Sequence, residues 1–263
     1  MDEIVNSLLS TMNAQLPLMY SSMPGIQVIE ETDWLGMLSS HPDVFYNAVY
    51  ESRFSQNNAP NKVDEVVSLF STRSQLPMVW FVTPACQPKN LSEVLETRGF
   101  KHAYRSPGMF LQLEEFYQKS NPDSPHKITR VSTVEQLSQW ILPGKEGFGI
   151  SDSVIKAYFD LFKSKGFESQ TPWKLFVGMV HGLPTTCVRL FCTNDVAGIY
   201  HVATIPSARG KGYGTEITVA ALEAAKKLGY KLAILASSPA GYHVYYRLGF
   251  RDCCFCDAYI GPQ

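Results

Sequence analysis

Short apolar runs and helix-period patterns alternate along the second half of the chain. The apolar runs predict strands, and apolar residues three and four positions apart predict helices. Two strands flank the turn His181-Gly182-Leu183-Pro184, so we expect a hairpin there. The predicted strands are Ile128 to Val131, Trp173 to Val180, Thr185 to Cys192, Val196 to Ile205, Lys231 to Ala236 and Arg251 to Ile260; the predicted helices are Thr133 to Ile141, Asp152 to Lys165, Gly212 to Leu228 and a short one at Tyr242.

A glycine-rich turn stands between the strand that ends near Ile205 and the next helix. It contains Arg209, Gly210, Lys211, Gly212 and Gly214. Glycines let the backbone approach a ligand closely, and the first N–H groups of a helix have no partner within the helix. The positive end of the helix dipole and two cationic side chains add to this effect. The turn therefore predicts an anion site, best suited to phosphate.

Two common phosphate-binding loops do not fit the spacing. A P-loop needs a hydroxyl residue after Gly-Lys, and Gly212 stands at that position. The dinucleotide fingerprint needs a third glycine where Thr215 stands, and an acidic residue after the next strand, which ends at Ala236 without one. The pattern that remains is Arg-x-x-Gly-x-Gly, from Arg209 to Gly214.

In this pattern the sequence resembles the GNAT superfamily of N-acetyltransferases, whose coenzyme A pyrophosphate loop has the same form. The segment Tyr242 to Phe250 is similar to the family's short helix that presents a tyrosine and ends at Leu-Gly-Phe. The resemblance implies the GNAT fold, an α/β (α+β) domain with a mixed, mostly antiparallel central sheet and helices on both faces. It also implies acetyl-CoA as the co-substrate, and no metal.

The first half of the chain repeats part of this order. After helical patterns at Val5 to Ala14 and Asn61 to Phe70 come a strand-like run from Met78 to Val82, a helix from Leu91 to Thr97, and Arg98-Gly99-Phe100. Strand, loop, helix and Gly-Phe follow one another as they do at the end of the second half. We interpret the first half as a degenerate GNAT-like domain, so the chain has two such domains in tandem; the alternative is an accessory helical extension. It has no Arg-x-x-Gly-x-Gly to hold coenzyme A.

The clearest boundary is the segment Tyr117 to His126, which is rich in turn formers and has no aliphatic residue. We therefore expect a degenerate GNAT-like or accessory domain at residues 1–117, a linker at 118–126 and the acyltransferase domain at 127–263.

The composition is that of an ordinary globular protein, with 45% hydrophobic residues and a formal net charge of −1. No basic excess suggests nucleic acid as a partner, and no apolar run is long enough for a membrane span. The N-terminal residues lack the pattern of a secretory signal. We expect a cytoplasmic protein whose six cysteines are reduced.

The resemblance assigns the ligands of the donor. In the family, the strand before the loop diverges from its neighbour and pairs with pantetheine, which implies backbone contacts from Val202, Ala203 and Thr204. Backbone N–H groups of the loop and the first helical turn would hold the pyrophosphate, which implies Arg209, Gly210, Lys211, Gly212, Tyr213, Gly214 and Thr215. The alternative for the side chains of Arg209 and Lys211 is that they are solvated loop charges.

Tyr245 stands where the family has its general acid, five residues before Phe250. A phenol can donate to a leaving sulfur while it stays protonated at neutral pH. Tyr246 points about 100° away on a helix, and Tyr242, one turn earlier, could also reach the site. The alternative is that all three rings pack against the sheet.

The general base is where the sequence departs from the family. Many relatives carry a Glu near the start of the strand before the loop, but Val196 to Ala208 has no carboxylate, and Gly198 stands in the corresponding stretch. Asp195 is explained more simply as a turn residue. His201 is the only side chain of this strand with a suitable ordinary pKa. A packed core histidine, deprotonation by water, or an amine that arrives neutral are the alternatives.

Cys253, Cys254 and Cys256 include a Cys-x-x-Cys spacing. Residues three apart on a strand point to opposite faces, and no second ligand pair follows nearby. We therefore expect buried free thiols rather than a zinc site.

The sequence thus predicts an acyl-CoA-dependent N-acyltransferase that moves acetyl from acetyl-CoA to a small-molecule or peptide amine by direct attack, with no nucleic acid or membrane as partner. Glu146, Asp152 and Asp160 could attract a cationic amine or be solvated surface charges. Two alternatives stay open: a non-catalytic acyl-CoA-binding or regulatory protein, and an acyltransferase with a longer acyl donor and an amino acid acceptor.

Overall fold

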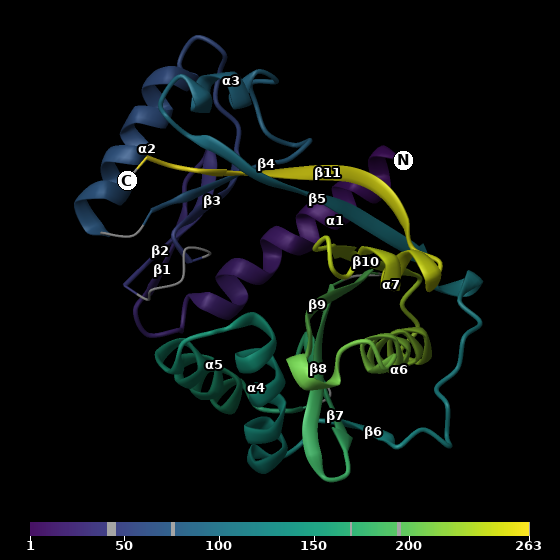
Figure 1. Ribbon diagram of the computed structural model, residues 1–263. Helices are drawn as coiled ribbons and strands as arrows, with labels where there is room; N and C mark the ends of the chain where they lie inside the picture. Colours follow the sequence, from purple (N-terminus) through teal and green to yellow (C-terminus); the bar gives the residue numbers. More distant parts are fainter. Residues whose placement is uncertain (41–45, 75–76, 169, 194–195, 263) are drawn as a thin grey trace. The chain divides into compact units, whose positions relative to one another are not determined.

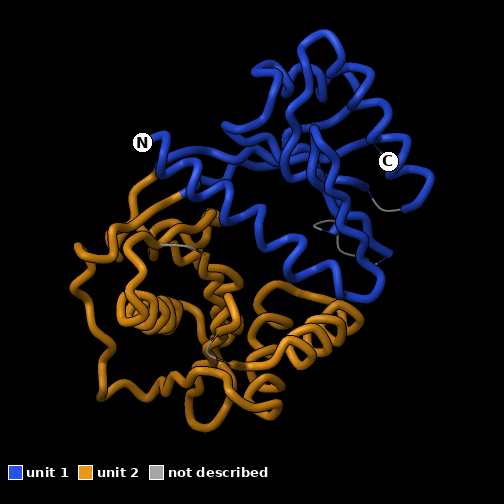
Figure 2. The backbone as a smooth tube through the Cα atoms, turned by 180° about the vertical axis from the view of Figure 1, so that it is seen from behind, with its two compact units in different colours: residues 1–108, 253–263 blue, residues 109–252 orange. Residues whose placement is uncertain are grey.

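The structure is a computed structural model that describes all residues except 41–45, 75–76, 169, 194–195 and 263. It forms two compact units, one of residues 1–108 and 253–263 and one of residues 109–252 (Figure 2). These bounds are not those of the predicted domains: residues 109–126 belong to the second unit and residues 253–263 to the first. Asp195 lies outside the described residues.

The second unit carries the predicted alternation of strands and helices. Its elements are the end of β5 (Lys101–Gln112), β6 (His126–Arg130), α4 (Val134–Phe148), α5 (Asp152–Lys165), β7 (Trp173–Val180), β8 (Leu183–Thr193), β9 (Val196–Thr204), α6 (Tyr213–Lys227), β10 (Leu232–Ala236) and α7 (Tyr242–Arg247). Strands β6 to β9 form an antiparallel meander, β10 runs parallel to β9, and β5 lies next to β10. Helices α4 and α5 cover one face of the meander and α6 covers the other (Figure 1). The predicted mixed, mostly antiparallel sheet with helices on both faces is confirmed.

The first unit is built from a related order of elements. It contains α1 (Asp2–Gln15), a π-helical turn (Leu16–Tyr20), β1 (Ile26–Glu30), β2 (Trp34–Ser39), β3 (Ala48–Ser52), α2 (Ala59–Arg73), β4 (Val79–Val82), α3 (Leu91–Glu96), most of β5 and the end of β11 (Arg251–Ile260). Strands β1, β2 and β3 are antiparallel, β4 is parallel to β3, and β11 lies between β4 and β5. The order β3-α2-β4-α3-β5 repeats β9-α6-β10-α7-β11, so the first half also has a GNAT-like topology.

Each face of the second unit's sheet has its own apolar core. On the α6 face, Ile217, Ala221 and Leu222 pack with Ile199 of β9 and Leu235 of β10. Leu228, the last residue of the predicted helix, is half exposed and lies just beyond the end of α6. On the other face, the ring of Trp140 packs against Phe162 and donates its N–H to the Val188 carbonyl at 3.0 Å. None of the helices in the described part of the chain is long and apolar enough to cross a membrane.

Candidate active site

A cleft of about 650 Å³ opens in the second unit, where the end of β9 meets α6 and α7. Its walls come from five segments: the end of α4, the end of β9, the glycine-rich loop with the first turn of α6, the segment after β10, and α7. The residues that line it are Gly147, Phe148, Val202, Ala203, Thr204, Ala208, Arg209, Gly210, Gly212, Tyr213, Gly214, Thr215, Ser238, Ala240, Gly241, Val244, Tyr245 and Arg247. Of the residues predicted to bind the donor, Lys211 is the one that this set leaves out.

The edge of β9 is open along the cleft. Strand β10 pairs with β9 from Val196 to Gly198, opposite Leu232 to Ile234, and the pairing does not continue to the end of β9. Within the part of the chain that the structure describes, no strand therefore pairs with the backbone from Val202 to Thr204 on that side. This is the divergence of strands that the family resemblance implies.

The glycine-rich loop supplies a row of backbone donors. Gly210 and Gly212 have φ angles of 77° and 84°, and Gly212 is the N-cap of α6. In the described part of the chain, the N–H groups of residues 210–215 donate to no protein acceptor. A Cβ at Gly210 or Gly212 would meet no atom within 4 Å. The glycines are thus needed for the left-handed backbone, and the space beside them is open to a ligand.

Tyr245 is the one of the three α7 tyrosines that lines the cleft. Its side chain is buried, and this burial raises the pKa of its phenol to about 12. Gly241 makes room for the ring, since a Cβ there would lie 2.8 Å from a ring carbon. The Tyr242 hydroxyl instead donates to Asp252 at 3.1 Å, and Tyr246 stacks on Tyr242 with half of its surface exposed.

His201 occupies a bulge in β9 rather than the cleft. The register between β8 and β9 shifts between Cys187 and Arg189, and His201 has a φ of 55°. Its ring stacks on Trp140 and Tyr158, with centroids 5.0 and 5.5 Å away. Burial, with a smaller contribution from the charge of Arg189, lowers its pKa to about 3. A group with this pKa is too weak a base to accept a proton from an amine, and His201 does not line the cleft, so the geometry argues against the base role.

The described residues that line the cleft include neither a carboxylate nor a histidine that could act as a base. At Gly198, a Cβ would lie 2.3 Å from the ring of Tyr200, so this ring fills the space beside the glycine. Among the acidic residues that could attract an amine, Asp152 pairs with Lys145 and Asp160 pairs with Lys156. Glu146 is exposed, and none of the three lines the cleft.

The end of α4 contributes Gly147 and Phe148 to the cleft and extends beyond the predicted end of this helix. The helix was expected to end at Ile141, but it continues through Pro143 to Phe148 and ends at Gly149, whose φ is 68°. A Cβ at Gly144 would lie 2.4 Å from His201 Nε2, and one at Gly147 would lie 2.9 Å from Ala203 Cβ. The signal in the sequence was the pair of glycines three residues apart, which lets this face of the helix touch β9.

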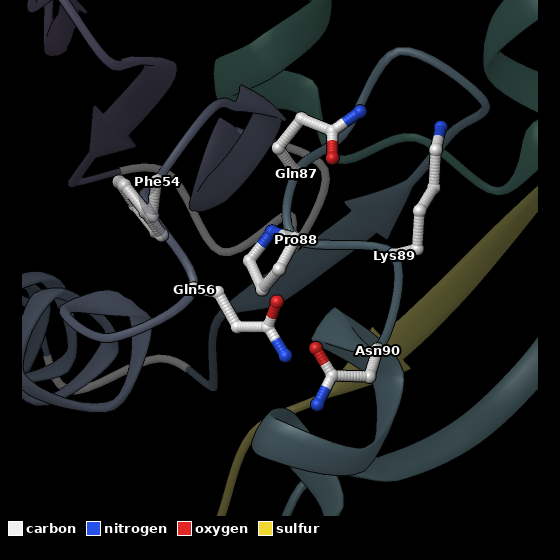
Figure 3. A pocket seen from close by; sticks show the side chains of 6 residues that line it. All are labelled: Phe54, Gln56, Gln87, Pro88, Lys89 and Asn90. Atoms are coloured by element: carbon white, nitrogen blue, oxygen red, sulfur yellow. The ribbon is translucent and has the colours of Figure 1, made fainter.

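The first unit has a different cavity at the corresponding place, between the loop after β3 and the loop after β4 (Figure 3). This cavity of about 370 Å³ is lined by Phe54, Gln56, Gln87, Pro88, Lys89 and Asn90. Figure 3 shows the carboxamides of Gln56 and Asn90 turned toward each other. The strand edge is closed here: Gln87 N–H donates to the Ser52 carbonyl and Phe54 N–H donates to the Gln87 carbonyl. At this position the described residues of the first unit therefore have no open strand edge, and its sequence has no Arg-x-x-Gly-x-Gly loop.

The described residues contain no group of three or more His, Cys, Asp or Glu side chains placed to hold a metal ion. In this segment Cys254 and Cys256 are buried and Cys253 is partly buried, and none of the three forms a disulfide bond. The Cys253 thiol donates to the Gly108 carbonyl.

Comparison with known families and structures agrees with the geometry. Residues 140–250 match the model of the acetyltransferase (GNAT) family. The chain therefore contains a GNAT acetyltransferase domain, and this match covers the whole cleft. Among curated proteins, no relative matches the sequence.

The fold of the whole chain is similar to solved structures of low sequence identity. A GCN5-related N-acetyltransferase from Kribbella flavida is 15% identical, with a TM-score of 0.76 over 99% of this chain and 96% of that chain. A tandem GNAT protein from the clavulanic acid biosynthesis pathway is 13% identical, with a TM-score of 0.63 over 100% of this chain and 96% of that chain. A GCN5-related N-acetyltransferase from Sphaerobacter thermophilus is 14% identical, with a TM-score of 0.61 over 88% and 81%. The first half thus belongs to the same tandem architecture.

Proposed function

We propose that the protein is an N-acetyltransferase that moves the acetyl group of acetyl-CoA to the amine of a small molecule or peptide. The observation that carries this proposal is one cleft that joins the free N–H groups of residues 210–215, the open edge of β9 and the side chain of Tyr245. The free N–H groups suit the phosphates of the donor, and the open edge of β9 suits an extended arm that contains amides. The side chain of Tyr245 suits the leaving sulfur.

The reaction needs no covalent enzyme intermediate. The amine nitrogen attacks the thioester carbonyl carbon, the carbon–sulfur bond breaks, and coenzyme A leaves while the amide forms. Binding both reactants in one cleft supplies orientation. The described residues that line the cleft include no carboxylate or histidine to deprotonate an ammonium group, so the amine arrives in its neutral form, and the proton that it loses on forming the amide passes to water.

Tyr245 acts on the leaving group. Its pKa of about 12 lies above that of a simple thiol, about 8.5. Complete proton transfer from the phenol to the thiolate is therefore uphill, and the contribution of Tyr245 is a hydrogen bond to the sulfur as negative charge develops. Such a bond to a charged group is worth about 1.5–3 kcal/mol.

The test is a thiol-release screen of acetyl-CoA and longer acyl-CoA donors against panels of amines, including amino acids. With the best pair, Tyr245→Phe should lower kcat by about 10- to 100-fold, as the loss of such a bond predicts. Its binding of coenzyme A should be unchanged. Tyr246→Phe is the matched control, because Tyr246 does not line the cleft, and it should keep full turnover.

A second candidate is a non-catalytic acyl-CoA-binding protein. The observation that favours it is that the described residues lining the cleft include no carboxylate or histidine to act as a general base. Measurable binding of coenzyme A without thiol release for any donor and amine would favour this candidate and contradict the first.

A further inference from the structure

Arg209 opens the glycine-rich loop, yet its side chain contacts protein carbonyls. Its Nη2 donates to the Gly147 carbonyl at the end of α4, at 2.9 Å, and its Nε donates to the Thr204 carbonyl at the end of β9, at 3.2 Å. The rigid planar guanidinium can hold two acceptors in fixed geometry, which a lysine ammonium does not do. Arg209 therefore ties the last turn of α4 to the last residue of β9.

The two tied segments form one wall of the cleft and touch each other closely. A Cβ at Gly147 would lie 2.9 Å from Ala203 Cβ and 3.3 Å from the Thr204 carbonyl. Gly147, Ala203 and Thr204 all line the cleft. Any shift of the end of α4 would thus change the width of the cleft along the open edge of β9.

The contact also has an electrostatic consequence. The last carbonyls of a helix have no partner within the helix and carry partial negative charge. At the end of α4, this charge would oppose a phosphate in the same cleft, and the Arg209 guanidinium satisfies the Gly147 carbonyl.

A different arginine is available to an anion. Arg247 of α7 lines the cleft, and no hydrogen bond or ion pair of its guanidinium occurs within the described residues. Lys211, by contrast, is exposed and does not line the cleft.

We propose that Arg209 is a positioning residue, which holds the α4 wall against β9 so that the thioester is presented correctly, and that Arg247 supplies the positive charge for the phosphates of the donor. This proposal rests on the proposed acetyl transfer and assigns the two arginines of its cleft. It differs from the motif, in which Arg209 was expected to contact the pyrophosphate.

The experiment compares Arg209→Met, Arg209→Lys and Arg247→Met with two donors, acetyl-CoA and S-acetyl-pantetheine, which lacks the ADP part. Arg209→Met should lower kcat by about 10- to 100-fold with both donors, since small misplacements of reactants cost this much. Arg209→Lys should not restore the rate, because lysine keeps the positive charge but lacks the planar guanidinium that donates to two carbonyls at once. Arg247→Met should raise KM for acetyl-CoA and leave the kinetics with S-acetyl-pantetheine unchanged.

The opposite pattern would overturn the assignment. If Arg209→Met raises only the KM for acetyl-CoA and Arg209→Lys has the wild-type KM, Arg209 is a phosphate ligand. Hydrogen exchange provides a second measurement that needs no turnover. Amides of residues 144–150 should exchange faster in Arg209→Met than in wild type, and at the wild-type rate in Arg247→Met. If wild-type protein releases no thiol but this exchange difference holds, the proposed function fails and the positioning role stands; equal exchange rates contradict the positioning role.

Discussion

His201 has a left-handed backbone conformation, and its ring stacks on the rings of Trp140 and Tyr158. Regular alternation would place Ile199 and His201 on one face of β9, yet Ile199 packs in the α6 core while His201 packs against α4 and α5. The extra residue of the bulge reverses the alternation. A bulge has no signature in the apolar pattern, so the sequence marked His201 as titratable without revealing that it is enclosed by aromatic rings.

His201 should make the stability of the protein depend on pH. Its pKa is about 3 in the folded chain, against an ordinary value of 6.5, so between these limits only the unfolded chain binds the proton. Stability should therefore fall as pH falls through this window, by about 1 kcal/mol per pH unit from this group. Urea unfolding from pH 4 to pH 7 measures the slope.

The control is His201→Phe, which keeps a ring but does not titrate, and its slope should be smaller than that of wild type. His126, whose pKa burial also lowers, stays in both proteins and contributes equally. Equal slopes for wild type and His201→Phe would show that the ring titrates normally in the folded state.

The loop glycines allow a matched pair of substitutions. Gly212 has a φ of 84°, whereas Gly214 lies in α6 and its Cβ would be 3.3 Å from Thr204 Oγ1. Gly212→Ala should lower the free energy of unfolding by about 1–2 kcal/mol, the cost of left-handed backbone at a residue with a Cβ. Gly214→Ala should not, because alanine is favoured in a helix. Thermal unfolding compares them, and equal losses would contradict the assignment of strain to Gly212.

At the scale of elements, strong periodicity was enough to predict most of the second unit. Helix α5 and strands β7 and β11 have the predicted ends, and the glycine-rich loop and Tyr245 line the cleft as their motifs implied. Helix α4 differs because Pro143 and Gly144 are poor helix residues, and here tertiary packing against β9 overrides propensity. Strands β1 to β3 were missed, since their short runs carry no turn or ligand motif that singles them out.

The close packing of α4 on β9 predicts how a side chain at position 144 would change the stability of the protein. A Cβ there would lie 2.4 Å from His201 Nε2. Gly144→Ala should therefore cost about 1–3 kcal/mol of stability, as overpacking of a core does, although alanine has the higher helix propensity. Ser138→Ala, at an exposed position of the same helix, is the control. A Gly144→Ala protein as stable as this control would mean that α4 does not lie so close to β9.

At the scale of the whole molecule, two strands cross the boundary between the compact units. Strand β5 begins in the first unit and ends in the second, and β11 starts at the end of the second unit and continues into the first. In the first unit, β11 pairs with β4 from Asp257 to Ile260. In the second, Met109, Leu111, Leu113 and Phe116 belong to the core on the α6 face. The turn-rich segment that the sequence indicated as a boundary therefore lies within the second unit.

This arrangement makes a prediction about fragments. Residues 109–252 and 127–252 differ by the segment that carries those four core residues, whose backbone also bonds to the rest of the unit: Leu113 N–H donates to the Lys231 carbonyl at 2.8 Å, and Lys226 Nζ donates to the Phe116 carbonyl at 2.7 Å. The longer fragment should unfold cooperatively in urea. The shorter one should not, because each buried apolar side chain that it lacks is worth about 1.5–3 kcal/mol, and together they approach the stability of a whole domain. If the shorter fragment unfolds with the same midpoint and slope, residues 109–126 are a linker after all, and the core of the second unit is complete without them.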